Sequence, residues 1–142
     1  MRRMMVFMAA LAIPVSAATV GMGASASAAA PVGCTKVTGT ISGNLTFKGC
    51  GTLGKGSAPA ASLASGGTIT WKGKHKGTTT FSVTVTPPVQ GACKSGSTEY
   101  DATGSVTADT SGKVTVGSAV SGKACVDGSG NVTLVKHTIF VL

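Results

Sequence analysis

Few side chains in this sequence have the types and spacing that catalysis needs. Glu99 and Asp101 lie two residues apart, so in a strand they share one face and could act as the acid and base of glycoside chemistry. His75 and His137, the two histidines, have no Ser or Cys with an acid beside them in a recognisable nucleophile motif. Alternating charges are also typical of the solvated face of a half-exposed strand. We therefore expect no catalytic residues, and surface positions for both histidines.

The four cysteines, Cys34, Cys50, Cys93 and Cys125, form the second group of reactive side chains. A structural zinc site would need paired Cys-x-x-Cys spacing, which the sequence lacks. In an exported domain, four cysteines most simply form two disulfides. The turn DGSGN, which begins at Asp127, has alternate oxygen ligands like a calcium loop but lacks the later bidentate Glu. We expect neither a metal nor a cofactor.

The segment WKGKHKG predicts a basic hairpin tip, which consists of Trp71, Lys72, Lys74, His75 and Lys76. Flanking glycines would let this tip project and meet an anionic partner, such as a cell-wall polymer or an acidic protein surface. Solvated turn lysines that serve only solubility are the simpler alternative. These five residues are the candidate binding site that the sequence offers.

Residues 1–28 are typical of a cleaved signal peptide. The basic start MRR precedes the apolar run MMVFMAALAIPVSAATV, and ASASAAA then supplies the small residues that a signal peptidase needs. We place the cut after Ala28, with Ala26 or Ala29 as alternatives. Pro14 interrupts the apolar run, which disfavours a retained membrane helix. A lipid anchor on Cys34 is also disfavoured, because it would leave an odd number of cysteines.

Residues 29–142 have the size of one domain, which we expect to be secreted or associated with the cell wall and free of the membrane. Both arginines of the chain lie in the signal, so the positive charge of this domain comes from lysines alone. A nucleic-acid-binding protein normally clusters its basic groups and uses Arg with stacking aromatics beside it. The dispersed lysines argue against nucleic acid as a partner and suit exposed strand edges.

Residues 66–88 are the strongest structural element in the sequence. Apolar residues alternate with Thr, Ser and Lys on both sides of the basic tip, which predicts a β-hairpin. We expect Ile69 to lie opposite Phe81. Trp71 then lies opposite Thr79 and shares one apolar face with Phe81.

An earlier hairpin, CTKVTGTISGNLTFKGC, turns at SGN. Its apolar residues are expected to face one another: Val37, Ile41, Leu45 and Phe47. Folding at this turn brings the two end cysteines within about two residues of register, which suits a disulfide. Residues 51–65 are small and poor in strand formers, so we expect a surface loop there, with a short strand or turn near its second leucine as an alternative.

The segment TEYDATGSVT predicts a later strand with two different faces. Its inner face is expected to hold Tyr100, Ala102, Val106 and Ala108, and its outer face Glu99, Asp101 and Thr103. After the turn ADTSGK, a return strand is predicted at residues 113–120, with Tyr100 opposite Val120. That register leaves Cys93 and Cys125 about two residues out of alignment, which favours a second local disulfide.

Residues 131–142 are expected to form one long final strand, in mid-sheet or crossing between sheets, because apolar residues point to both faces. Gly, Thr, Ser and Val dominate the domain, and no stretch repeats its apolar residues at helical spacing. The sequence therefore predicts an all-β fold. We expect an immunoglobulin-like antiparallel β-sandwich of about seven to eight strands with two disulfides, in preference to a closed barrel.

Three segments of the chain resemble a group of small secreted actinobacterial β-sandwich proteins of unknown function. They are the Trp hairpin at residues 67–81, the segment around TEYDATGSVT at residues 93–107, and the late cysteine motif VSGKAC at residues 120–125. The resemblance implies export, a β-sandwich and an actinobacterial source. It brings no activity, substrate or active site that could be carried over.

These features favour a secreted, non-enzymatic, disulfide-stabilised protein that binds the cell surface or an extracellular partner. A secreted inhibitor or small-molecule carrier is the alternative, and an enzyme comes third. A concave cavity lined by Trp71 and Tyr100 would favour the carrier. An exposed rigid loop near Cys93 would favour the inhibitor. Convergence of Glu99 and Asp101 with a histidine would favour the enzyme.

Overall fold

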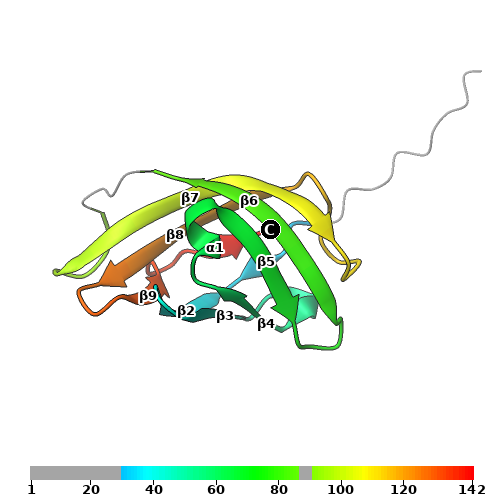
Figure 1. Ribbon diagram of the computed structural model, residues 1–142, viewed down its shortest axis with the longest axis horizontal. Helices are drawn as coiled ribbons and strands as arrows, with labels where there is room; N and C mark the ends of the chain where they lie inside the picture. The colour runs from blue at the N-terminus through cyan, green and yellow to red at the C-terminus, as the bar shows by residue number, and fades with distance from the viewer. Residues whose placement is uncertain (1–29, 87–90) are drawn as a thin grey trace, which may run out of the picture.

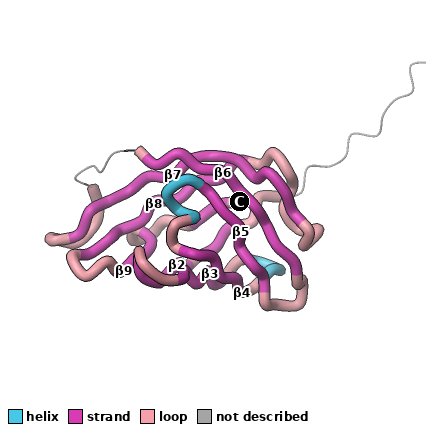
Figure 2. The backbone as a smooth tube through the Cα atoms, viewed as in Figure 1, coloured by secondary structure: helices cyan, strands magenta, loops and turns pink. Residues whose placement is uncertain are grey.

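The computed structural model of the protein describes residues 30–86 and 91–142. The predicted signal peptide, residues 1–28, lies outside the described residues. Strands make up 55% of the described chain, which also has one short α-helix and one 3-10 turn (Figure 2). Its elements are β1 (Gly33–Cys34), β2 (Lys36–Thr40), β3 (Asn44–Lys48), η1 (Gly51–Leu53), β4 (Lys55–Pro59), α1 (Ser62–Ser65), β5 (Gly66–Trp71), β6 (Gly77–Val85), β7 (Ser97–Asp109), β8 (Ala119–Asp127), β9 (Asn131–Leu134) and β10 (Phe140–Val141).

The strands β2 to β9 form a closed ring in which each strand pairs with its neighbours in the chain (Figure 1). All these pairings are antiparallel, and β9 closes the ring because it pairs with both β8 and β2. The short strands β1 and β10 extend the sheet beside β8. The all-β prediction is confirmed. The closed eight-stranded barrel differs from the expected immunoglobulin-like sandwich, whose two sheets would remain separate.

The central hairpin is confirmed, but its predicted register is wrong by two residues. Ile69 pairs with Thr79, and Phe81 pairs with Gly67. A shift of two residues leaves every side chain on its original face. Ile69, Trp71 and Phe81 therefore all face the core as expected, and each is almost completely buried.

Residues 51–65, predicted as a surface loop, contain the strand β4, which pairs with β3 and β5. This prediction is wrong because the small residues of β4 make room for a large neighbour. Gly56 lies opposite Trp71, and a Cβ atom at Gly56 would lie 2.5 Å from the indole ring. The predicted turn near Leu63 is the single helical turn α1.

The first hairpin pairs Val37 with Phe47, as its alternation predicts. Cys34 and Cys50 flank this hairpin and form a disulfide. Ile41 was expected to face Leu45, but Leu45 pairs with Gly39 instead. Ile41 lies in the turn after β2 with 59% of its surface exposed.

The strands β7 and β8 pair four residues away from the predicted register, so that Tyr100 lies opposite Ala124 and Val120 lies opposite Gly104. The return strand starts at Ala119, because residues 110–118 form a long connection. The predicted disulfide between Cys93 and Cys125 is nevertheless present. It joins the loop before β7 to the strand β8.

The predicted final strand is interrupted between β9 and β10. Residues 135–139 leave the ladder, and His137 has a φ of 65°. The two parts pair with different neighbours: β9 lies between β8 and β2, and β10 lies between β8 and β1. Apolar residues on both faces were therefore a sign that the segment changes position in the sheet.

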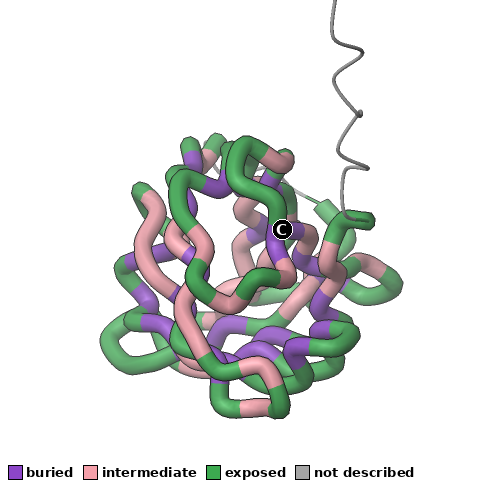
Figure 3. Tube along the Cα trace, turned by 90° about the vertical axis from the view of Figure 1, so that its right-hand side faces the viewer, coloured by how far each residue is buried: buried purple, intermediate pink, exposed green. Residues whose placement is uncertain are grey.

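The interior of the barrel is packed with the inward side chains of these strands. Buried residues follow the strands, and exposed residues gather at the turns (Figure 3). The ring of Phe140 lies 5.3 Å from that of Phe47 and 5.9 Å from that of Phe81. The three aromatic rings fill one part of the interior and leave space beyond them.

Candidate functional site

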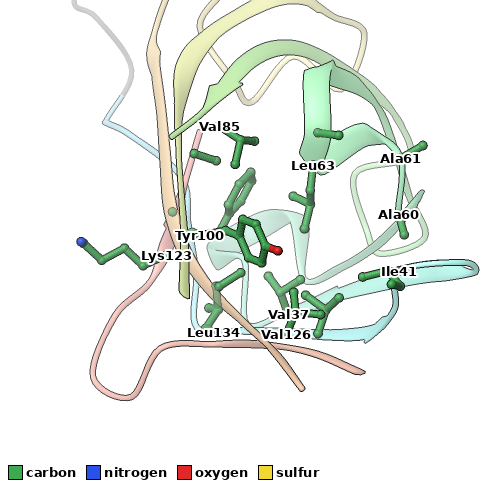
Figure 4. Close-up of a pocket in the computed structure, with 16 residues that line it drawn as sticks. Val37, Ile41, Ala60, Ala61, Leu63, Val85, Tyr100, Lys123, Val126 and Leu134 are labelled. Atoms are coloured by element: carbon green, nitrogen blue, oxygen red, sulfur yellow. The ribbon is translucent and has the colours of Figure 1, made fainter. Parts of the chain in front are cut away.

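A half-open cavity of about 290 Å³ occupies the part of the barrel that the aromatic rings leave free. Its walls come from β2, β6, β7, β8 and β9, from α1 and from the turn after β2 (Figure 4). The side chains that line it are overwhelmingly apolar. An eight-stranded barrel is just wide enough either to be filled by its own side chains or to hold one small ligand.

Small residues at inward positions create this space. Ala102 and Ala124 line the cavity from β7 and β8, and three further alanines line it from the connection between β4 and β5. Gly122 lies opposite Ala102, and a Cβ atom there would come within 2.6 Å of the Phe140 ring. Gly122 therefore gives the Phe140 ring the space to lie close to β8, where it lines the cavity.

Two hydrophobic side chains that line the cavity are only partly buried. Ile41 and Leu63 line the cavity from the turn after β2 and from α1, respectively. Leu63 is half-buried, and Ile41 is largely exposed. Both keep apolar surface available at the opening.

The hydroxyl group of Tyr100 points into the cavity, where Figure 4 shows its oxygen among apolar side chains. Within the described residues, this hydroxyl has no hydrogen-bond partner in the protein. Tyr100 was predicted to face inward, and the structure confirms this. Trp71, the other aromatic residue expected in such a cavity, does not line it.

Lys123 also lines the cavity, but its ammonium group points away from it (Figure 4). This group lies 2.6 Å from Asp101 Oδ2 and 3.5 Å from Glu99 Oε1. The hydrogen bond to Asp101 is the main cause of a pKa of Lys123 above its ordinary value. The charge of Lys123 is therefore held outside the cavity.

Glu99 was predicted to be solvated on the outer face, and this prediction is wrong. Its side chain is buried beneath the loop before β7, where Oε2 accepts a hydrogen bond of 2.6 Å from the backbone N–H of Ala92. Gly91 lies against the same carboxylate, so a side chain at position 91 would collide with it. Glu99 thus holds this loop, together with the disulfide at Cys93.

The structure does not bring Glu99 and Asp101 together with a histidine. Both carboxylates converge on Lys123. His75 lies between β5 and β6, and His137 lies between β9 and β10. No group of three potential metal-binding side chains occurs among the residues that the structure describes.

The predicted basic tip connects β5 and β6, and the structure separates its Trp from its lysines. Lys72, Lys74 and Lys76 are exposed, and His75 is half-buried. Trp71 is only 2% exposed, so it belongs to the core and not to the surface of the tip. This corrects the inclusion of Trp71 in the candidate binding site.

The tip and the cavity lie at opposite ends of the barrel. Because neighbouring strands are antiparallel, connections alternate between the two ends. The turn after β2 and the segment containing α1 line the cavity, and the turn after β8 lies at the same end of the barrel. The β5–β6 connection belongs to the other end (Figure 1). That other end is closed by the buried Trp71 and its neighbours.

A chain of hydrogen bonds fixes the closed end. Trp71 Nε1 donates to the hydroxyl of Thr79, which in turn donates to Asp109 Oδ1. Asp109 also accepts hydrogen bonds from Ser111 and from backbone N–H groups of the following turn. Burial alone would raise the pKa of Asp109, but hydrogen bonds, chiefly from Thr79 and Ser111, outweigh it and lower the pKa.

The DGSGN segment is a hairpin turn between β8 and β9, as predicted. Asp127 accepts hydrogen bonds from the side chain and backbone of Asn131 and from the backbone of Ser129. The hydrogen bond from the Asn131 side chain is the main cause of a lowered pKa of Asp127. The carboxylate of Asp127 is thus engaged within the turn.

Sequence reasoning missed the small residues of the cavity, because Ala102, Gly122 and Ala124 have no chemistry that marks them as functional. Their size was the one available indication of a cavity, because such small side chains cannot fill the barrel interior around Tyr100.

No family model, curated protein or solved structure matches the chain. Among the described residues, no helix is long and apolar enough to span a membrane.

Proposed function

We propose that this protein is a secreted, non-enzymatic binding protein that carries one small apolar molecule in the cavity of its barrel. The observation that carries the proposal is the half-open apolar cavity of about 290 Å³ that Tyr100 and Phe140 help to line. Ligand sites in proteins are typically concave, mostly apolar and equipped with a few polar groups. This cavity has those properties.

Two features support export. The first 28 residues have the composition of a signal peptide. Two disulfides join Cys34 to Cys50 and Cys93 to Cys125, and disulfides persist in oxidising compartments. A carrier outside the cell needs a stable fold. One disulfide links the two ends of the first hairpin, and the other links the loop before β7 to β8.

The apolar lining of the cavity also favours ligand binding. Its walls lose contacts wherever no atoms face them, and a ligand restores those contacts and removes apolar surface from water. For comparison, an engineered apolar cavity of ~150 Å³ binds benzene. The present cavity has room for a molecule of about two rings.

The test is binding of the neutral fluorescent probe Prodan, whose skeleton is a single two-ring naphthalene, to the oxidised mature protein. We expect saturable fluorescence enhancement. Ala124→Phe, which fills the cavity from β8, should abolish it. Ala119→Phe is the matched control, because Ala119 lies on the same strand and is exposed. If Ala124→Phe and Ala119→Phe bind the probe as well as the wild type does, the proposal is wrong.

Attachment to an anionic surface is a second candidate function. Its support is the exposure of Lys72, Lys74 and Lys76 on the connection between β5 and β6. A cell-wall polymer or an acidic protein surface would be the partner, and Trp71 would take no part. Because the tip lies at the end opposite the cavity, the two functions can be tested separately.

A further inference from the structure

We infer that the ligand of this cavity is a neutral molecule with a single hydrogen-bond acceptor, such as a ketone or ether oxygen, on an otherwise apolar skeleton. This inference rests on the proposed function and specifies the chemistry of the ligand. Three observations lead to it: the polar groups of the cavity, its charges and its size.

The first observation concerns polar groups. Of the described side chains that line the cavity, only Tyr100 and Lys123 carry a polar atom. The ammonium group of Lys123 is held outside by Asp101, which leaves the hydroxyl of Tyr100 as the polar group that faces a ligand (Figure 4). Tyr100 is half-buried, and a ligand that fills the cavity would remove water from its hydroxyl group. A phenol O–H is a good donor, and a donor that loses contact with water needs an acceptor in its place. The ligand should therefore present one acceptor to Tyr100.

The second observation concerns charge. Lys123 is the only charged residue among the described lining residues, and two carboxylates, Glu99 and Asp101, surround its ammonium group. Two carboxylates and one ammonium group together carry a net negative charge beside the cavity. An anionic ligand would enter an apolar cavity without a free cation to pair with, which is strongly unfavourable. A carboxylate is therefore a poor ligand, whereas a neutral oxygen is a good one.

The third observation concerns size and position. Tyr100 lies opposite Ala124 across the β7–β8 pair, and Phe140 also lines the cavity. A flat skeleton of about two rings can pack against Phe140, because aromatic and apolar surfaces pack well against a ring. Its single polar group can then reach the Tyr100 hydroxyl.

Three naphthalene derivatives of similar shape test this inference by calorimetric titration. 2-Acetylnaphthalene carries one neutral acceptor, 2-isopropylnaphthalene carries none, and 2-naphthoate is an anion. The matched variant is Tyr100→Phe, which removes only the hydroxyl, and a thermal melt checks that it folds. The measured quantity is the ratio of the Kd of the hydrocarbon to the Kd of the ketone.

We expect this ratio to fall about five- to tenfold from the wild type to Tyr100→Phe, because the variant loses one hydrogen bond to the ketone. The Kd of the hydrocarbon should stay within about twofold. Naphthoate should bind the wild type at least about tenfold more weakly than the ketone. Hydrocarbon binding with an unchanged ratio in Tyr100→Phe, or tightest binding of naphthoate, would overturn this inference and leave the proposed function intact. Failure of all three to bind would overturn both.

Discussion

Trp71 Nε1 donates a hydrogen bond to Thr79 Oγ1, 2.8 Å away inside the closed end of the barrel. The two residues lie on paired strands, β5 and β6, and both are almost completely buried. Trp71 is the only Trp in the chain. Because Trp71 lies in the core, the basic side chains of the tip beside it are those of three lysines and one histidine, without the Trp.

Thr79→Val tests this hydrogen bond. The substitution keeps the shape of the side chain but leaves the indole N–H and Asp109 without their shared partner. We expect a loss of about 1–3 kcal/mol in the free energy of unfolding, the usual cost of an unpaired buried donor. Urea denaturation measures it. Thr84→Val, at an exposed position on the same strand, should change the stability by less than about 0.5 kcal/mol.

Asp109 should make the stability depend on pH. Its pKa is lowered in the folded protein, so its contribution is fully present above the ordinary value of 3.8 and is lost as the pH falls through the lower folded value. Asp109→Asn should therefore unfold at a lower urea concentration than the wild type near pH 7. The difference between the two midpoints should narrow once the pH falls below 3.8. A difference that stays constant down to the acid transition would contradict the assignment.

Gly56→Ala tests the packing of β4 under Trp71. The added methyl group would lie 2.5 Å from the indole ring and 2.7 Å from Ile69, and both neighbours are buried. Overpacking of this kind typically costs about 1–3 kcal/mol. Thermal unfolding measures the loss, with Gly128→Ala as the control, because nothing lies within 4 Å of a Cβ atom at Gly128. Equal stability of the two variants would show that β4 can shift away.

Charge reversal at Lys72, Lys74 and Lys76 tests the second candidate function. The triple Glu variant should lose binding to purified cell wall at low salt, because attraction between exposed charges is screened as salt increases. Its affinity for Prodan should be unchanged, since the cavity lies at the other end of the barrel. Undiminished binding to cell wall would remove the lysine tip as an attachment site.

The sequence predicted the pairing of neighbouring segments and both disulfides, because these depend on alternation and on short distances along the chain. It did not determine the registers. In the central hairpin, a shift of two residues keeps Ile69 and Trp71 on the same face, so alternation cannot distinguish the two alternatives. Between β7 and β8, the predicted register was wrong by four residues, because the connection at residues 110–118 is longer than the turn that the sequence indicated.

Other features depended on contacts between distant segments. β4 has weak strand propensity, and it becomes a strand because β3 and β5 pair with it and Trp71 needs its small residues. Closure of the barrel depends on β9, which pairs with β2 more than ninety positions earlier in the chain, as in the pair Thr38 and Thr133. Glu99 is buried by a loop that no local pattern places over it. The cavity arises from small residues on several strands and could not be predicted from any one of them.

The alternation of connections around the barrel gives the molecule a direction. If the lysines of the β5–β6 connection held the protein against an anionic layer, the opening bordered by Ile41 and Leu63 would face the surrounding medium. Cargo could then enter and leave while the protein stayed anchored. Immobilisation through an engineered tag at that connection should accordingly leave uptake unaffected, whereas a tag in the turn after β8 should obstruct it.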